Sequence, residues 1–110
     1  MRKIKFYRSY FVDFYNMQNN KVQDKIEWTL GLIRDHVYVP EKYFKHISDG
    51  DGLFEIRVHV GTDIYRIFSF FDKGDLIVLI NGFQKKTMKL PKSEIELAKK
   101  LKKEYFDDKK

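Results

Sequence analysis

The sequence predicts one α+β domain over residues 1–110, with its elements in the order β-α-α-β-β-β-α. Two neighbouring segments, 53–60 and 64–71, are rich in β-branched and aromatic residues and are joined by a short link, as in a β-hairpin. A helical stripe of apolar residues precedes them, and a lysine-rich helix follows. We therefore expect a mostly antiparallel, twisted sheet with two N-terminal helices on one face and the C-terminal helix near the other.

The N-terminal third predicts one short strand and two helices. Polarity alternates over residues 4–8, which indicates an opening strand, and Ser9 can cap a first helix. A second helix should begin at Asn20, with Gln23 three residues later in a capping-box spacing, and Pro40 should close it. Its apolar stripe comprises Val22, Ile26, Leu30, Ile33 and Val37, widened by Trp28 and Leu32.

Three strands and a final helix account for the remainder. Segments 53–60 and 64–71 form the hairpin, and the turn at 72–75 leads into a third strand, 76–80. This third strand is apolar throughout, which is typical of a strand that is covered on both faces. Pro91 suits the first turn of the last helix, whose acidic residues precede its lysines as the helix dipole favours.

Register arithmetic places two arginines side by side. A two- or four-residue hairpin loop pairs residues whose numbers sum to 123, so Arg57 should oppose Arg66. The next turn gives pairs that sum to 147, so Asn81 should flank Arg66 on its other side. Opposed like charges destabilise a sheet by roughly 0.2–1 kcal/mol, which points to an anion at this position, phosphate being the obvious candidate. Removing one arginine should then cost little stability.

The same register divides the sheet into two faces. The face expected to pack on the N-terminal helices carries Phe54, Ile56, Val58, Val60, Tyr65, Ile67, Ser69, Phe71, Leu76, Val78 and Ile80. The opposite face has an apolar end, which the last helix can cover, and a cationic end. The cationic end carries Arg57, His59, Arg66, Asn81, Phe83 and Lys85.

Each candidate at the cationic end has a functional and a structural interpretation. The two guanidinium groups can grip a phosphate bidentately, or Glu55 can simply pair with them. Lys85 and Lys86 can bind phosphate or transfer protons, or lie solvated at a strand end. His59 can transfer protons or be an ordinary surface residue, and Phe83 can stack a base or fill the core edge.

Composition limits the class of protein. There is no Cys, no apolar run long enough to span a membrane, and no apolar signal-peptide core, so we expect a cytoplasmic protein. The three His lack metal-ligand spacing, so neither a metal nor another cofactor is expected. Residues 1–83 carry 12 Lys/Arg and 11 Asp/Glu, whereas residues 84–110 carry 10 Lys and 5 Asp/Glu. The basic C-terminal quarter indicates an acidic partner or nucleic acid, or else a solvated helix.

The ordered motifs resemble the RelE/ParE superfamily of toxin–antitoxin toxins, and within it the HigB-like, phage-associated branch. The matching segments are 40–45, 52–57, 65–67 and 81–87, with Pro91, Glu94, Ile95 and Ala98. The resemblance implies a RelE-like fold and a ribosome-dependent mRNA endonuclease in which the ribose 2′-hydroxyl attacks the scissile phosphate without a metal.

The resemblance also suggests roles for individual residues. Arg57, Arg66 and Lys86 match basic positions of the family's strands, and Lys45 and Lys85 match the HigB-like pattern. We take Arg57, Arg66, Lys85 and Lys86 as catalytic candidates. Substrate-binding candidates are Lys45, His59, Asn81 and Phe83. Leu53 and Glu55 stand where the RelE branch has lysines, and Tyr105 is a stand-in for its C-terminal tyrosine.

Expected partners are mRNA, the ribosome and a cognate antitoxin, a helix-turn-helix protein of HigA-like type, with no membrane. Two alternative functions stay open. ParE-like relatives share the fold but poison gyrase, and a non-catalytic nucleic-acid-binding module would use the same basic groove. The paired arginines and the Lys85-Lys86 rim favour RNA cleavage.

Overall fold

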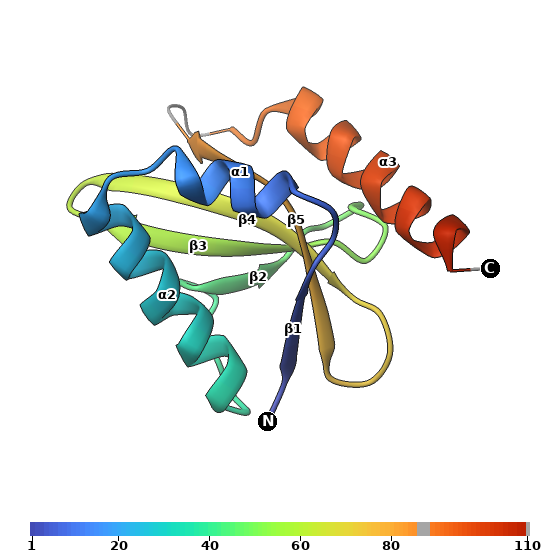
Figure 1. Ribbon diagram of the computed structural model, residues 1–110, viewed down its shortest axis with the longest axis horizontal. Helices are drawn as coiled ribbons and strands as arrows, with labels where there is room; N and C mark the ends of the chain where they lie inside the picture. The colour runs from blue at the N-terminus through green and yellow to red at the C-terminus, as the bar shows by residue number, and fades with distance from the viewer. Residues whose placement is uncertain (86–88, 110) are drawn as a thin grey trace.

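A five-stranded mixed sheet forms the centre of the computed structural model, which describes residues 1–85 and 89–109 (Figure 1). Its strand order is β1-β5-β4-β3-β2. The strands are β1 (Lys3–Phe6), β2 (Phe44–His46), β3 (Phe54–Val60), β4 (Asp63–Phe71) and β5 (Leu76–Lys85). Only β1 and β5 pair in parallel, and the other neighbours are antiparallel.

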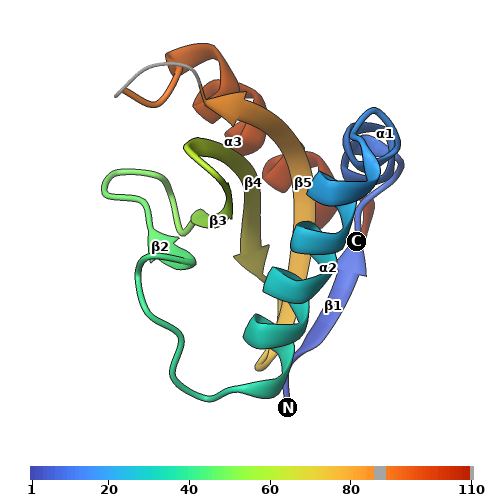
Figure 2. The same ribbon diagram turned by 90° about the vertical axis from the view of Figure 1, so that its left-hand side faces the viewer.

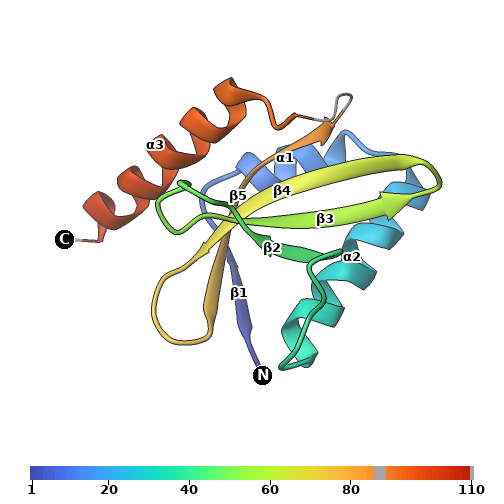
Figure 3. The ribbon, with the colours of Figure 1, turned by 180° about the vertical axis from the view of Figure 1, so that it is seen from behind.

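Helices cover both faces of this sheet. The helices α1 (Tyr10–Asn16) and α2 (Asn20–Asp35) lie over one face, in front of it in Figure 1 and behind it in Figure 3. Their buried side chains, Phe14 and Ile26 among them, pack with Ile56 and Ile67 of the sheet. The helix α3 (Lys92–Asp108) packs on the opposite face with a second cluster. That cluster comprises Tyr7, Ile47, Leu53, Phe68, Phe70, Val78, Ile80, Ala98, Leu101 and Tyr105.

The predicted α+β class and element order are confirmed, with one further strand. The extra strand is β2, which has three residues and was too short to predict from periodicity. Figure 2 shows the segment from α2 to β2 leading around to the far side of the sheet. There β2 pairs with β3, and Lys45 stands opposite Glu55. No helix among the described residues is both long and apolar enough to cross a membrane.

The helix α2 begins at Asn20 as predicted, but its capping residue and its C-terminal end differ from the prediction. The N-cap is Asn19, whose side chain accepts a hydrogen bond from the Val22 N–H, so Asn20 is the first helical residue and not the cap. The helix ends at Asp35, well before Pro40. Arg2 from the start of the chain donates to the carbonyl groups of residues 33, 36 and 37, which satisfies groups left free at a helix end.

Two predicted members of the α2 stripe are therefore not core residues. Val37 follows the helix and is 95% exposed, and Trp28 is 49% exposed. The stripe itself is correct at Val22, Ile26 and Ile33, which are buried. Trp28 is thus a half-exposed aromatic side chain on α2 that contacts Tyr43.

The β3–β4 hairpin confirms the first register prediction. Gly61 and Thr62 form a two-residue turn, and Gly61 has φ of 60°, as the first central residue of a type II′ turn requires. Arg57 and Arg66 are directly paired. Both lie on the face opposite to α2, because their neighbours Ile56 and Ile67 point into the α2 cluster.

The β4–β5 register differs from the prediction at two places. The turn pairs Phe71 with Ile77, one residue away from the predicted register, and β5 then carries a bulge. Ile67 pairs with Gly82 whereas Ser69 pairs with Leu79, so two residues of β5 oppose Phe68. Phe83, and not Asn81, therefore stands opposite Arg66, and Ile64 pairs with Lys85 instead of Phe83.

The predicted faces of β5 are wrong between the turn and the bulge, because the turn shifts the register there by one residue. Ile77 and Leu79 point toward α1 and α2. The side chains expected there, Leu76, Val78 and Ile80, instead contact the α3 cluster. The prediction that this strand is covered on both faces is confirmed, since Ile77 to Ile80 are all fully buried.

Candidate functional site

A pocket of about 380 Å³ lies where β2, β3 and β4 meet the beginning of α3. We call it the arginine pocket. Its lining residues are Lys45, His46, Ile47, Ser48, Glu55, Arg57, Arg66, Leu90 and Ile95. Three strands supply its charged groups, and the segment entering α3 supplies an apolar wall. The position agrees with the cationic end predicted from the sequence.

Glu55 joins the two arginines. Its Oε1 lies 3.0 Å from Arg57 Nε, and the same oxygen is ion-paired with a terminal nitrogen of Arg66. Glu55 and Arg57 are two residues apart on β3 and so point to the same face. The repulsion between the arginines is thus offset within the chain. The sequence left open whether an anion or Glu55 neutralises the two arginines, and the structure favours Glu55.

The two arginines differ in accessibility. The side chain of Arg66 is only 2% exposed, whereas that of Arg57 is 24% exposed. Burial lowers the pKa of Arg66 from the ordinary value for arginine. Its Nε–H has no hydrogen-bond partner among the described residues. Arg57 is therefore the arginine that a bound molecule reaches first, with Arg66 behind it.

Two exposed residues of β2, Lys45 and His46, line the rim of the pocket, and of the two Lys45 shares the face of Glu55. Lys45 lies opposite Glu55 in the β2–β3 ladder, so its side chain emerges on the same face. His46 contacts the ring of Phe54, with the centroids 5.1 Å apart. The pocket therefore combines one buried carboxylate with two guanidinium groups and an ammonium group.

The Asn81-Gly82-Phe83 segment does not line the pocket, but it contacts the elements around it. Asn81 is buried and its side-chain N–H donates to the carbonyl of Glu94 in the first turn of α3, at 3.2 Å. A Cβ on Gly82 would lie 2.6 Å from the ring of Phe14, so α1 needs glycine here. Phe83 packs against Phe68, with ring centroids 5.4 Å apart. This packing favours the core interpretation of Phe83.

His59 is not brought to the arginine pocket. Its Nε2–H donates to the carbonyl of Lys42 at 2.8 Å, and its ring contacts Tyr43. The hydrogen bond fixes one ring nitrogen in a structural contact. His59 borders another pocket, between α2 and the β3–β4 turn.

The two C-terminal lysine candidates cannot be placed in the same way. Lys86 lies outside the described residues. Lys85 is described only as the last backbone position of β5, paired with Ile64.

Tyr105 holds α3 against the sheet. It lies about ten residues along the helix from Ile95, the α3 residue that lines the pocket. At 1.5 Å per residue this corresponds to roughly 15 Å along the helix axis. The Tyr105 hydroxyl donates to Asp72 at 2.6 Å, and Lys109 also binds that carboxylate. Burial, followed by the bond to Asp72, raises the pKa of Tyr105 to about 12. Its position indicates a structural role.

Sequence reasoning underestimated two residues of the pocket. The sequence suggested Glu55 only as a neutralising partner of the arginines. Its spacing from Arg57 and the hairpin register nevertheless place its carboxylate next to both Arg57 and Arg66. His46 was not predicted as a site residue, because only its pairing in β2 brings it to the pocket. Among residues 1–85 and 89–109, no group of three His, Asp or Glu side chains is arranged to hold a metal ion.

Comparison with known proteins gives one family. The model of the phage-derived Gp49-like proteins (DUF891) matches residues 13–103, which is most of the chain. The match includes α2, all of β2 to β5, and every lining residue of the arginine pocket. No curated protein matches the sequence.

Proposed function

Because the chain belongs to the Gp49-like family, which is phage-derived and toxin-like, we propose that it is a HigB-like toxin that cuts mRNA on the ribosome. The toxin-like family also implies an antitoxin partner. One observation carries the proposal of cleavage: Arg57 and Arg66 are paired across two strands at an open pocket, with the Glu55 carboxylate between them. A carboxylate next to paired guanidinium groups is suited to moving a proton beside a bound phosphate.

In the proposed reaction the ribose 2′-hydroxyl oxygen attacks the adjacent phosphorus and the bond to the 5′-oxygen breaks. The products are a 2′,3′-cyclic phosphate and a 5′-hydroxyl end. Glu55 accepts the proton of the 2′-hydroxyl, and the Lys45 ammonium group donates one to the departing 5′-oxygen. Protons and charge then balance without a metal ion at the chemical step.

Arg57 binds the scissile phosphate directly in this proposal, because it is the more exposed arginine. Arg66 contributes charge from behind and orients Glu55. Lys85 and Lys86 follow on β5 and beyond, and we propose them as further phosphate ligands. Asn81 and Phe83 support the pocket indirectly, through the first turn of α3 and the core.

The test is single-turnover cleavage of mRNA on programmed ribosomes, with the chemical ends of the product identified. We expect cyclic phosphate or 3′-phosphate ends. Arg57→Ala and Glu55→Gln should each slow the reaction by roughly a hundredfold or more, the usual loss for one transition-state contact. Lys73→Gln, which changes an exposed lysine in the β4–β5 turn, is the charge-matched control.

Other outcomes would identify a different function. Ends bearing a 3′-hydroxyl contradict attack by the 2′-hydroxyl. Gyrase-linked DNA damage without RNA cleavage would support the ParE-like alternative. RNA binding that depends on Arg57 but yields no product would support a non-catalytic binding module.

A further inference from the structure

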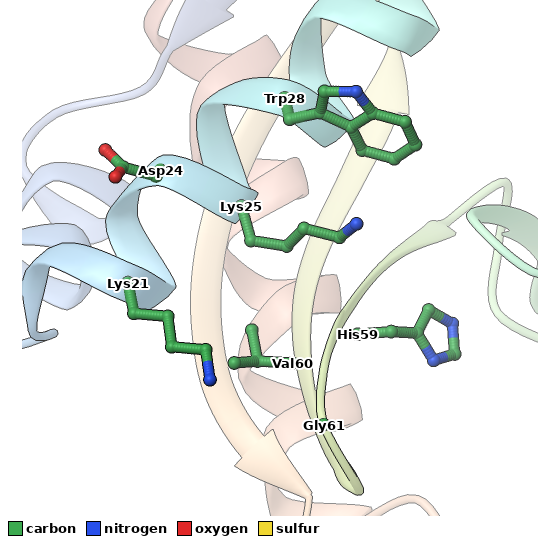
Figure 4. A pocket seen from close by; sticks show the side chains of 7 residues that line it. All are labelled: Lys21, Asp24, Lys25, Trp28, His59, Val60 and Gly61. Carbon is green, nitrogen blue, oxygen red and sulfur yellow. The ribbon is translucent and has the colours of Figure 1, made fainter.

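A second pocket, of about 490 Å³, lies between α2 and the β3–β4 turn. Figure 4 shows Lys21, Lys25 and Trp28 projecting from α2 toward the strand that carries Val60. Asp24 belongs to the same lining but its carboxylate points the other way. The open side of the pocket is therefore formed by two ammonium groups and a half-exposed indole.

Aromatic side chains continue from this pocket in a row around the edge of β3. The ring centroids of Trp28 and Tyr43 are 5.6 Å apart, and those of Tyr43 and His59 are 6.0 Å apart. We call these three residues the ring row. Lysines lie over two of the rings: Lys25 Nζ is 4.1 Å from the Trp28 centroid, and Lys42 Nζ is 5.6 Å from that of Tyr43.

The ring row leads to the arginine pocket. The Arg57 backbone N–H donates to the Tyr43 carbonyl at 2.8 Å, which fixes the row to the strand that carries the arginine. His59 follows Arg57 by two residues on β3, so both side chains emerge on the same face. One end of the ring row is consequently next to Arg57, and the other end is on α2.

We propose that the ring row is a binding site for single-stranded RNA that flanks the scissile phosphate. The proposal rests on the function proposed above and extends its substrate contacts to α2. Rings interleaved with cations suit single-stranded nucleic acid, because bases stack on the rings while ammonium groups bind the phosphates. An acidic protein segment would pair with the lysines, but its carboxylates would not stack on the rings that alternate with them.

Trp28 makes the proposal directly measurable, because it is the sole tryptophan of the chain. The probe is a short single-stranded RNA with 2′-O-methyl groups, which cannot be cleaved by 2′-hydroxyl attack. We expect saturable quenching of Trp28 fluorescence. The double variant Lys21→Gln/Lys25→Gln keeps the fluorophore and should raise the dissociation constant roughly tenfold or more, as expected for the loss of two ammonium–phosphate contacts.

The control is Lys73→Gln, whose lysine lies in the turn at the other end of β4 and should leave the dissociation constant unchanged. RNA that binds by anisotropy without changing Trp28 emission would overturn the ring row while leaving the arginine pocket intact. Quenching by an acidic peptide, but not by the RNA, would also overturn it and indicate protein docking. If the RNA quenches Trp28 as expected while the ribosome assay yields no product, the ring row stands and the cleavage proposal fails.

Discussion

The arginine pair offers a matched perturbation, because Arg57 and Arg66 share a carboxylate but differ in burial. The side chain of Arg66 is 2% exposed and its partner Glu55 is 5% exposed. Replacing Arg66 by Ala leaves the buried Glu55 paired with the partly solvated Arg57 and removes one partner of a buried ion pair, a change that typically destabilises by about 3–5 kcal/mol. Replacing Arg57, which is 24% exposed, removes a partly solvated partner and should destabilise by about 1 kcal/mol.

The measurement is urea unfolding of the parent, Arg57→Ala and Arg66→Ala at neutral pH. A change in stability moves the midpoint while the slope with denaturant stays constant. We expect a large shift for Arg66→Ala and a small one for Arg57→Ala. For cleavage we expect a different pattern: Arg57→Ala should lose activity although it loses little stability and stays folded.

The Glu55→Gln background isolates the cause. If the lost pairing with Glu55 explains the destabilisation, Arg66→Ala should cost clearly less stability when residue 55 is already neutral. The two changes are in contact, so their effects should not add. Equal costs in both backgrounds, or a larger cost for Arg57→Ala than for Arg66→Ala, would refute the assignment of a buried ion pair.

Three further predictions concern the elements around the site. Asn19→Ala should destabilise the protein by about 0.5–2 kcal/mol through loss of the α2 cap, and Asn20→Ala by much less, as urea midpoints will show. Gly82→Ala should destabilise by about 1–3 kcal/mol, because its Cβ meets the Phe14 ring, and near-UV circular dichroism should change with it. Hydrogen bonds from an ammonium group and a phenol lower the pKa of Asp72, so its contribution is present at neutral pH and is lost as pH falls; thermal melts of Asp72→Asn should show a weaker acid dependence than the parent.

The register of the first hairpin could be predicted because a local feature decides it. Gly61 and Thr62 leave room only for a two-residue turn, and the pairing of Arg57 with Arg66 follows by counting. The α2 core stripe was equally local, since a 3.6-residue period is visible in the sequence. The cap was misassigned by one residue, because Asn19 and Asn20 are chemically identical candidates and only the backbone path separates them.

Register counting could not decide whether Glu55 is ion-paired with Arg57 and Arg66, because it gives the positions of the residues and not their side-chain contacts. The sequence indicated both a free like-charge pair and its neutralisation by Glu55. The structure favours the second arrangement, since one Glu55 oxygen is shared by both guanidinium groups. The expectation that either arginine could be removed at little cost therefore applies to Arg57, which remains partly solvated, and not to Arg66.

The bulge in β5 was beyond sequence reasoning, and it determines what the 81–83 segment contributes. With one extra residue opposite Phe68, Ile80 and Asn81 both point toward α3, and Asn81 reaches the carbonyl of Glu94. That contact anchors the turn preceding Ile95, which forms part of the pocket wall. Without the bulge the register of Ser69 with Leu79 would continue, so Gly82 would stand opposite Arg66 and its close packing under α1 would be lost. The same residues therefore hold α3 and α1 in place next to the pocket, and in the proposed reaction the strand residues Arg57, Glu55 and Lys45 act on the RNA.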